Sequence, residues 1–159
     1  LFSFYTRGMS FIDMAHLKKK DLQNGFLSYR RRKTGQQLVI RWEKCMQEIV
    51  GKYPVDSLSP YLLPVLKYPF KDTHKHYRNV MSGINRNLKE IARLADISFP
   101  LSMYCARHSW ASAAKGKNIP ISVISEGMGH DSEATTQIYL ASLDNSVVDK
   151  ANAQILKSL

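Results

Sequence analysis

The sequence has few acidic residues, few cysteines and no long apolar run. Its 159 residues include 13 Asp and Glu against 23 Lys and Arg, a formal net charge of +10 at pH 7. A domain this basic usually binds a polyanion, whereas a surface kept only for solubility needs no such excess of one sign. No apolar run approaches bilayer-spanning length, and the first residues do not resemble a secretory signal. The composition therefore favours a nucleic-acid-binding protein with no membrane partner.

The scarcity of cysteine excludes two further classes. Cys45 and Cys105 lie far apart, and neither has a second cysteine nearby, so a cysteine-based metal site and a disulfide framework are both excluded. Each lies in a segment with apolar periodicity, so we expect buried thiols in a reducing cytoplasm. The chain opens on LFSFYTRGM, without an initiator Met. We expect it to come from a longer protein whose missing part is N-terminal.

The apolar content of 44% is enough for a core, and the length suits one domain. Residues 1–6 and 10–17 have helix-like apolar spacing with a glycine between them. Asn24-Gly25 is a strong hairpin signal, and Lys33-Thr34-Gly35 marks a second turn, so three short strands in a meander follow. A helix then places four apolar side chains on one face: Trp42, Cys45, Met46 and Ile49.

The second half of the chain is predicted to be helical. Asp72 or Thr73 can cap a long helix in which Gly83 is the weak point. The apolar positions of this helix recur at helical spacing: Tyr77, Val80, Ile84, Leu88, Ile91 and Ala95. Shorter helices are expected over 104–115, 121–128 and 131–141, and a last one over 145–156. The predicted fold class is α+β, mostly α, with a small three-stranded antiparallel sheet.

Four consecutive cations at the second hairpin need an explanation: Arg30, Arg31, Arg32 and Lys33. They repel each other unless an anion is bound, and a thin hairpin can bring them to the phosphates of a DNA groove. A solvated charge run is the plain alternative. Lys33 is fixed by its turn, so it can reach a leaving group and donate a proton.

Arg107 lies in a segment whose alanines and cysteine indicate burial. A buried arginine must be paired or face a ligand, and its planar fork matches two phosphate oxygens. Tyr104 lies about one helical turn earlier on the same side. His108 points elsewhere, so we expect a structural, hydrogen-bonding histidine.

The stretch GHDSEATTQIY places a histidine and a tyrosine nine positions apart. Gly129 is expected to end one helix, and Asp131 or Ser132 to cap the next. His130 and Tyr139 would therefore lie on either side of one short helix. An arginine that needs an anion, a hairpin lysine, a histidine at a helix junction and this tyrosine form one set.

This set resembles the catalytic domain of the tyrosine recombinases of the phage integrase family. The family's last box, Leu-Gly-His with a tyrosine nine residues later, resembles Met128-Gly129-His130 and Tyr139. The middle box, His-x-x-Arg-His, resembles YCARH at 104–108, and the lysine hairpin resembles KTG at 33–35. The first box, Gly-Leu-Arg-x-Ser-Glu-Leu, resembles GMSFIDM at 8–14. The resemblance spans nearly the whole chain, and the last box is its most specific part.

Two positions depart from the family pattern. Tyr104 takes the middle-box histidine position and keeps a hydrogen-bond donor. Ser10 takes the first-box arginine position and removes a cation, which Arg7 can replace if the backbone is helical there. The alternative is that Ser10 is an N-cap paired with Asp13, and Arg7 a surface cation.

The resemblance implies a domain over residues 1–159 that cleaves and rejoins double-stranded DNA. Tyr139 would form a 3′-phosphotyrosyl bond while Lys33 protonates the leaving 5′-oxygen, with no metal, ATP or other cofactor. Arg107, His130 and Arg7 would neutralise the phosphate oxygens, and His130 would either assist deprotonation of Tyr139 or only hydrogen-bond the phosphate.

The implied setting is a tetramer on DNA in a bacterial cytoplasm, associated with the nucleoid. The helix over 145–156 would dock on a neighbouring subunit or fold back on its own domain. Two rival functions remain open: a catalytically degenerate DNA-binding accessory protein, and a nicking enzyme similar to type IB topoisomerases.

Overall fold

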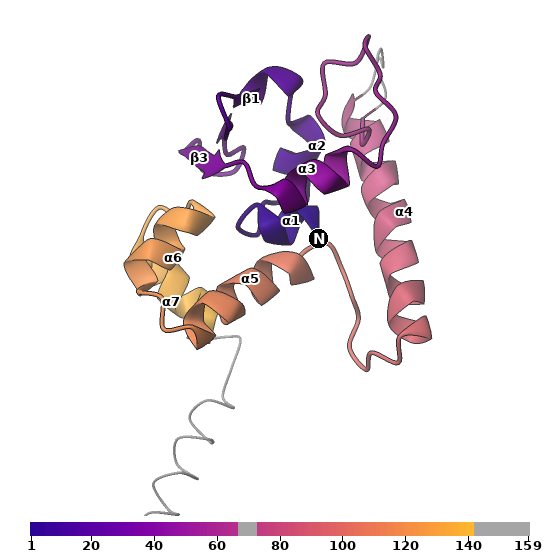
Figure 1. The fold of residues 1–159 in the computed structure, drawn as a ribbon. Coiled ribbons are helices and arrows are strands. Elements are labelled where there is room, and N and C mark those ends of the chain that lie inside the picture. The colour runs from indigo at the N-terminus through magenta and orange to yellow at the C-terminus, as the bar shows by residue number, and fades with distance from the viewer. Residues whose placement is uncertain (67–72, 142–159) are drawn as a thin grey trace, which may run out of the picture.

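The computed structural model describes residues 1–66 and 73–141 and consists mostly of helices around one small sheet (Figure 1). The N-terminal group contains α1 (Phe2–Tyr5), α2 (Phe11–His16), the 3-10 helix η1 (Lys19–Asp21), β1 (Leu22–Gln23), β2 (Phe26–Arg30), β3 (Gln37–Arg41), α3 (Lys44–Val50) and α4 (Thr73–Leu94). The C-terminal group contains α5 (Cys105–Gly116), α6 (Ile121–Met128) and α7 (Glu133–Ala141). The two groups meet where α1 packs on α5.

A serine cap starts α2, as the sequence predicts. The Ser10 hydroxyl accepts a hydrogen bond from Asp13 N at 3.3 Å and donates one to the Asp13 carboxylate at 2.6 Å. The buried Asp13 carboxylate also accepts the backbone N–H of Arg32 at 2.8 Å. Ser10 therefore anchors a carboxylate that ties α2 to the loop between β2 and β3.

Replacing Ser10 by Ala should lower the free energy of unfolding by about 0.5–2 kcal/mol, since the cap is lost. Urea denaturation followed by circular dichroism measures this change. Ser10→Thr keeps the hydroxyl and is the matched control, expected to stay near the parent. An Ala variant as stable as the parent would show that the cap contributes nothing.

The sheet forms the predicted meander with the order β1-β2-β3, antiparallel throughout. Asn24 and Gly25 both have positive φ, 51° and 77°, as a primed hairpin turn requires. Leu27 pairs with Ile40 and Tyr29 with Leu38, so one face of the sheet is buried in the core.

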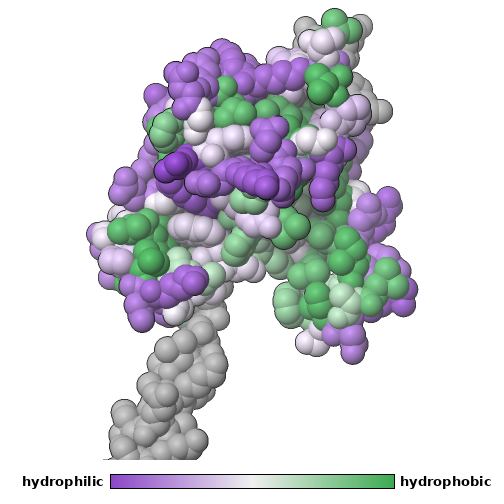
Figure 2. All heavy atoms as spheres, in the orientation of Figure 1, coloured by the Kyte–Doolittle hydropathy of each residue, from purple (hydrophilic) through white to green (hydrophobic). Residues whose placement is uncertain are grey.

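The long helix α4 runs through Gly83 without a break, but it is covered over only part of its length. Tyr77, Val80 and Ile84 pack against the N-terminal core, as predicted. Ile91 is 52% exposed and Ala95 is exposed, so the predicted apolar stripe continues beyond the part of the helix that packs on the core. The far end of α4 extends beyond the elements on which it packs, and an apolar patch lies over this part of the surface (Figures 1 and 2).

Both cysteines are only partly buried, which corrects the expectation of buried thiols. Cys45 and Cys105 each lie in the first turn of a helix, α3 and α5, where the side chain is near the helix end. The predicted helix over 145–156 and the capping residue Asp72 lie outside the described residues. In the described residues, no helix is long and apolar enough to cross a membrane.

Candidate active site

Arg107 connects the two groups of helices through its guanidinium group. The side chain is 3% exposed and donates to the carbonyls of Gly8 at 2.9 Å and Met128 at 2.8 Å. It also lies 3.0 Å from Nε2 of His130. Among the described residues no carboxylate is within ion-pair distance of Arg107. The burial predicted from sequence is thus present, and the positive charge is left for an anion.

Gly8 makes this arrangement possible. Its φ is +71°, and a Cβ placed on it would lie 2.9 Å from the Cα of Arg107. Any larger residue would push the loop between α1 and α2 away from α5. Gly8, the glycine of the predicted first-box segment, therefore allows the α1–α2 loop to lie directly against Arg107 on α5.

His130 follows Gly129, which ends α6 with a left-handed φ of 64°, as expected. Arginine can only donate, so Nε2 of His130 accepts from Arg107 and Nδ1 carries the proton. Nδ1 then donates to the Thr136 hydroxyl at 2.8 Å. Burial, followed by the charges of Arg107, Arg31 and Lys33, lowers the pKa of His130 to about 4. The imidazole is therefore neutral near pH 7.

Tyr139 lies on α7, two residues before that helix ends, and is partly buried. Its ring centroid is 5.8 Å from that of His130 and 6.4 Å from that of Tyr104. Burial raises the pKa of Tyr139, as do the nearby phenol of Tyr104 and a hydrogen bond with it, whereas Arg107 lowers it. The phenol is thus protonated at neutral pH and needs assistance to become a nucleophile.

Tyr104 lies at the start of α5 and is 51% exposed. Its ring contacts Tyr139 and His108 edge-on. Tyr104 therefore lies beside the candidate nucleophile and is exposed enough to donate a hydrogen bond to a bound ligand.

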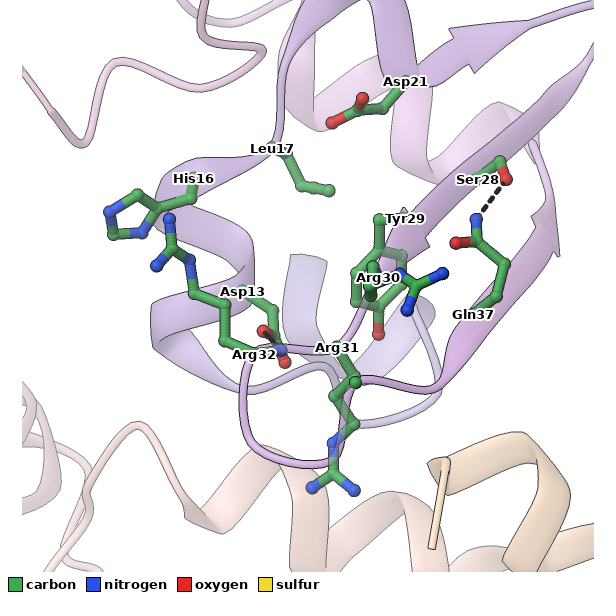
Figure 3. A pocket seen from close by; sticks show the side chains of 11 residues that line it. Asp13, His16, Leu17, Asp21, Ser28, Tyr29, Arg30, Arg31, Arg32 and Gln37 are labelled. Atoms are coloured by element: carbon green, nitrogen blue, oxygen red, sulfur yellow. Dashed lines mark hydrogen bonds between the residues drawn. The ribbon is translucent and has the colours of Figure 1, made fainter. Parts of the chain in front are cut away.

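The four cations of the hairpin do not act as one exposed run. Arg30, Arg32 and Lys33 are exposed, but Arg31 is only 6% exposed and donates to the carbonyl of Gly129. Figure 3 shows the three arginine side chains pointing in different directions, with Arg32 reaching toward His16. Arg31 is therefore buried while its three neighbours are exposed, and its contact with DNA remains a prediction.

Strand alternation explains why Arg31 points inward. Leu27 and Tyr29 are buried, whereas Ser28 and Arg30 are more exposed, so the next residue on the inner face is Arg31.

Arg31 and Arg107 donate to consecutive carbonyls, those of Gly129 and Met128, so their guanidinium groups lie near each other. Burial and then the charge of Arg31 lower the pKa of Arg107. Two buried like charges that form no ion pair in the described part of the chain favour binding of an anion between them.

A hollow of about 550 Å³ lies beside this hairpin, lined by residues of α2, β2 and the β2–β3 loop, among them Asp13, Tyr29 and the three arginines (Figure 3). Among the described residues, no group of three or more His, Cys, Asp or Glu side chains is placed to hold a metal ion. Asp13 and Asp21 also line this hollow, whereas Arg107, His130 and Tyr139 do not, so the hollow lies beside the candidate site rather than within it.

The sequence model described as the phage integrase family matches residues 4–146. The chain belongs to this family. The tyrosine recombinase XerA of Pyrococcus furiosus is 30% identical over 142 residues, which cover 85% of this chain and 46% of that protein. The chain thus spans less than half the length of this curated relative.

Solved structures with a similar fold include XerA recombinase, with a TM-score of 0.68 and 22% identity over 96% of this chain and 54% of that one. Another is the XerH site-specific recombinase bound to a palindromic difH substrate, a post-cleavage complex. Its TM-score is 0.63 and its identity 19%, over 96% of this chain and 45% of that one. These likenesses confirm the mostly helical phage integrase fold with its small antiparallel sheet.

In this family fold, the lysine turn lies next to the histidine box. The turn at 33–35 is closed by Gly35 N donating to Arg31 O at 2.8 Å, and the Thr34 hydroxyl reaches Gly129 O at 3.5 Å. Lys33 is exposed, yet it lies close enough to lower the pKa of His130, after burial and the two arginines. A lysine so placed can reach a group bound at His130.

Arg7 lies in the turn between α1 and α2 with a φ of 60°. Its stem passes α6, because a Cβ on Gly127 would lie 3.7 Å from Arg7 Cδ. Among the described residues it has no hydrogen bond or ion pair, and its charge is one of those that lower the pKa of Tyr29. The catalytic role expected for Arg7 remains a prediction. Arg31, which the sequence placed in the cationic hairpin run, is buried beside Arg107 instead.

Proposed function

We propose that residues 1–159 are the catalytic domain of a site-specific tyrosine recombinase that cleaves and rejoins double-stranded DNA. The main supporting observation is the pair of buried guanidinium groups, Arg107 and Arg31, which form no ion pair within residues 1–66 and 73–141. A neutral histidine and a phenol lie close to them. Such a pair of guanidinium groups suits the negative oxygens of a phosphodiester, and charge stabilisation is commonly the largest contribution to phosphoryl transfer.

In the proposed reaction, the Tyr139 oxygen attacks the phosphorus and forms a 3′-phosphotyrosyl bond, while the bond to the 5′-oxygen breaks. Lys33 donates a proton to that 5′-oxygen, which leaves as a hydroxyl. Neutral His130 can accept the phenol proton once Arg107 donates to the phosphate instead of to Nε2. The reverse steps rejoin the strand, and the diester keeps the bond energy, so neither ATP nor a metal ion is required.

The ligand of the proposed site is double-stranded DNA. The exposed Arg30 and Arg32 line the hollow beside the hairpin, and the exposed Lys33 lies in the turn near His130, so all three suit contacts with the phosphate backbone. The XerH neighbour is described as bound to its difH substrate, which supports the same class of ligand here. The protein would act in the cytoplasm, associated with the nucleoid.

A nicked suicide substrate tests the proposal, because cleavage releases a short oligonucleotide and traps the covalent adduct. We expect an adduct on a denaturing gel, in buffer with EDTA and without ATP, that depends on Tyr139. DNA binding without an adduct would favour the accessory protein instead. Relaxation of any supercoiled DNA, without partner sites, would favour the topoisomerase-like enzyme.

We also propose that the segment after Tyr139 couples subunit assembly to cleavage in a tetramer. The helix α7 ends at Ala141, so the segment that follows is tied directly to the nucleophile. A chain ending at Ser142 should bind a single half-site normally and fail to form the paired-duplex complex. It should cleave about 5- to 150-fold more slowly, the size of a coupling of about 1–3 kcal/mol. Native gels with one and two half-sites measure this. Normal pairing of the duplexes by the shortened chain would show that the segment serves only its own domain.

A further inference from the structure

His108 lies face to face with the candidate nucleophile. The rings of His108 and Tyr139 have centroids 5.0 Å apart and an interplanar angle of 2°. Tyr104 closes this group from the side, with its ring edge-on to His108 at 4.6 Å and 81°. Tyr139 is therefore supported on one face by an aromatic ring that is itself held by a third ring.

No side-chain hydrogen bond to the described part of the chain accounts for His108. Its Nδ1 is buried and has no partner among residues 1–66 and 73–141. This contradicts the expectation of a structural, hydrogen-bonding histidine, and a buried polar atom left unpaired calls for another explanation. Burial, followed by the charge of Arg107, lowers the pKa of His108, so the stacked ring is neutral.

The geometry also excludes His108 as the base for Tyr139 in this arrangement. The nitrogens of imidazole donate and accept within the plane of the ring. Since the two rings are parallel, neither nitrogen of His108 points at the phenol oxygen. A parallel neutral ring can, however, restrict how the phenol ring tilts and rotates. The backbone of α7 alone does not fix these motions of the side chain.

We propose that His108 is a positioning residue for strand cleavage, a flat support that holds the Tyr139 ring with its oxygen toward Arg107 and His130. The inference rests on the proposed function, because it takes Tyr139 as the nucleophile. Precise placement matters here, since a displacement of about 1 Å in a reacting group can reduce a rate by about 100-fold.

Two matched substitutions separate the flat ring from the imidazole nitrogens. His108→Phe keeps a flat ring without nitrogens, whereas His108→Leu keeps apolar bulk and loses the flat face. We expect the Phe variant to form adduct within about threefold of the parental rate and the Leu variant to be about 30- to 100-fold slower. Both should bind the nicked DNA with parental affinity, because His108 acts through Tyr139 rather than through DNA.

A second readout needs neither DNA nor activity. With 3-fluorotyrosine incorporated, the ¹⁹F resonance of Tyr139 is assigned by its loss in Tyr139→Phe, and the other seven of the 8 tyrosines report the fold. The Tyr139 resonance should move or broaden in His108→Leu and change little in His108→Phe. Apart from Tyr104, which also contacts His108, the other tyrosine resonances should stay in place. If the unsubstituted protein forms no adduct, the proposed function is wrong, but the ¹⁹F measurement still tests whether His108 positions the Tyr139 ring. A Phe variant as slow as the Leu variant, or a Leu variant with the parental rate and Tyr139 resonance, would overturn the positioning role.

Discussion

Tyr139→Phe should bind DNA with the parental affinity and form no covalent product. The ring keeps its contacts with His108, Tyr104 and His130, so the packing of α7 survives and only the oxygen is lost. Loss of a nucleophile in other covalent enzymes lowers the rate by at least about 10⁴-fold, which here means no detectable adduct. Fluorescence anisotropy measures binding, and a denaturing gel of the nicked substrate measures the adduct.

Tyr104→Phe is the matched control for this experiment. It removes the second phenol of the site but leaves the proposed nucleophile, so an adduct should still form, about 10- to 100-fold more slowly because a hydrogen-bond donor to the phosphate is missing. An adduct formed by Tyr139→Phe at any useful rate would move the nucleophile elsewhere, and Tyr104 would be the first alternative.

Local sequence signals predicted most of the fold because they act within a few residues. Ser10 caps α2, Asn24-Gly25 closes a hairpin and Gly129 ends α6, each as expected from its own chemistry. Local periodicity could not predict that Ile91 is exposed, because the sequence pattern does not reveal where the partner elements of α4 end. The helix predicted over 131–141 begins two residues later, at Glu133. Of the two predicted capping residues, Ser132 accepts a hydrogen bond from the first turn of α7.

The site was only partly predictable, since its parts meet through contacts distant in sequence. The histidine and tyrosine are related by one short helix, so their spacing was informative. The partners of Arg107 are carbonyls of Gly8 and Met128, and backbone atoms carry no sequence signature. Arg31 had a usable signal in the alternation of Leu27 and Tyr29, but the neighbouring cations concealed it.

Arg31→Ala should lower the adduct-forming rate by about 10²–10³-fold, the usual cost of removing one charge-stabilising donor from an active site. Its affinity for DNA should fall much less, because the lost contact matters most in the transition state. The reason lies in the position of Arg31: it is buried at Gly129, beside Arg107, while the first-box position holds the uncharged Ser10. Arg31→Lys keeps the charge but not the planar fork, so a partial loss is expected.

Arg7→Ala is the matched control that decides which arginine supplies the missing cation. Arg7 is not among the charges that chiefly lower the pKa of His130, so we expect a rate within about tenfold of the parent. The histidine itself gives a second measurement without DNA. The charge of Arg31 helps hold the pKa of His130 at about 4, so Arg31→Ala should raise that pKa and Arg7→Ala should leave it unchanged. Two-dimensional NMR of the histidine rings follows both titrations. A slow Arg7→Ala variant beside a fast Arg31→Ala variant would return the first-box role to Arg7, whatever the titrations show.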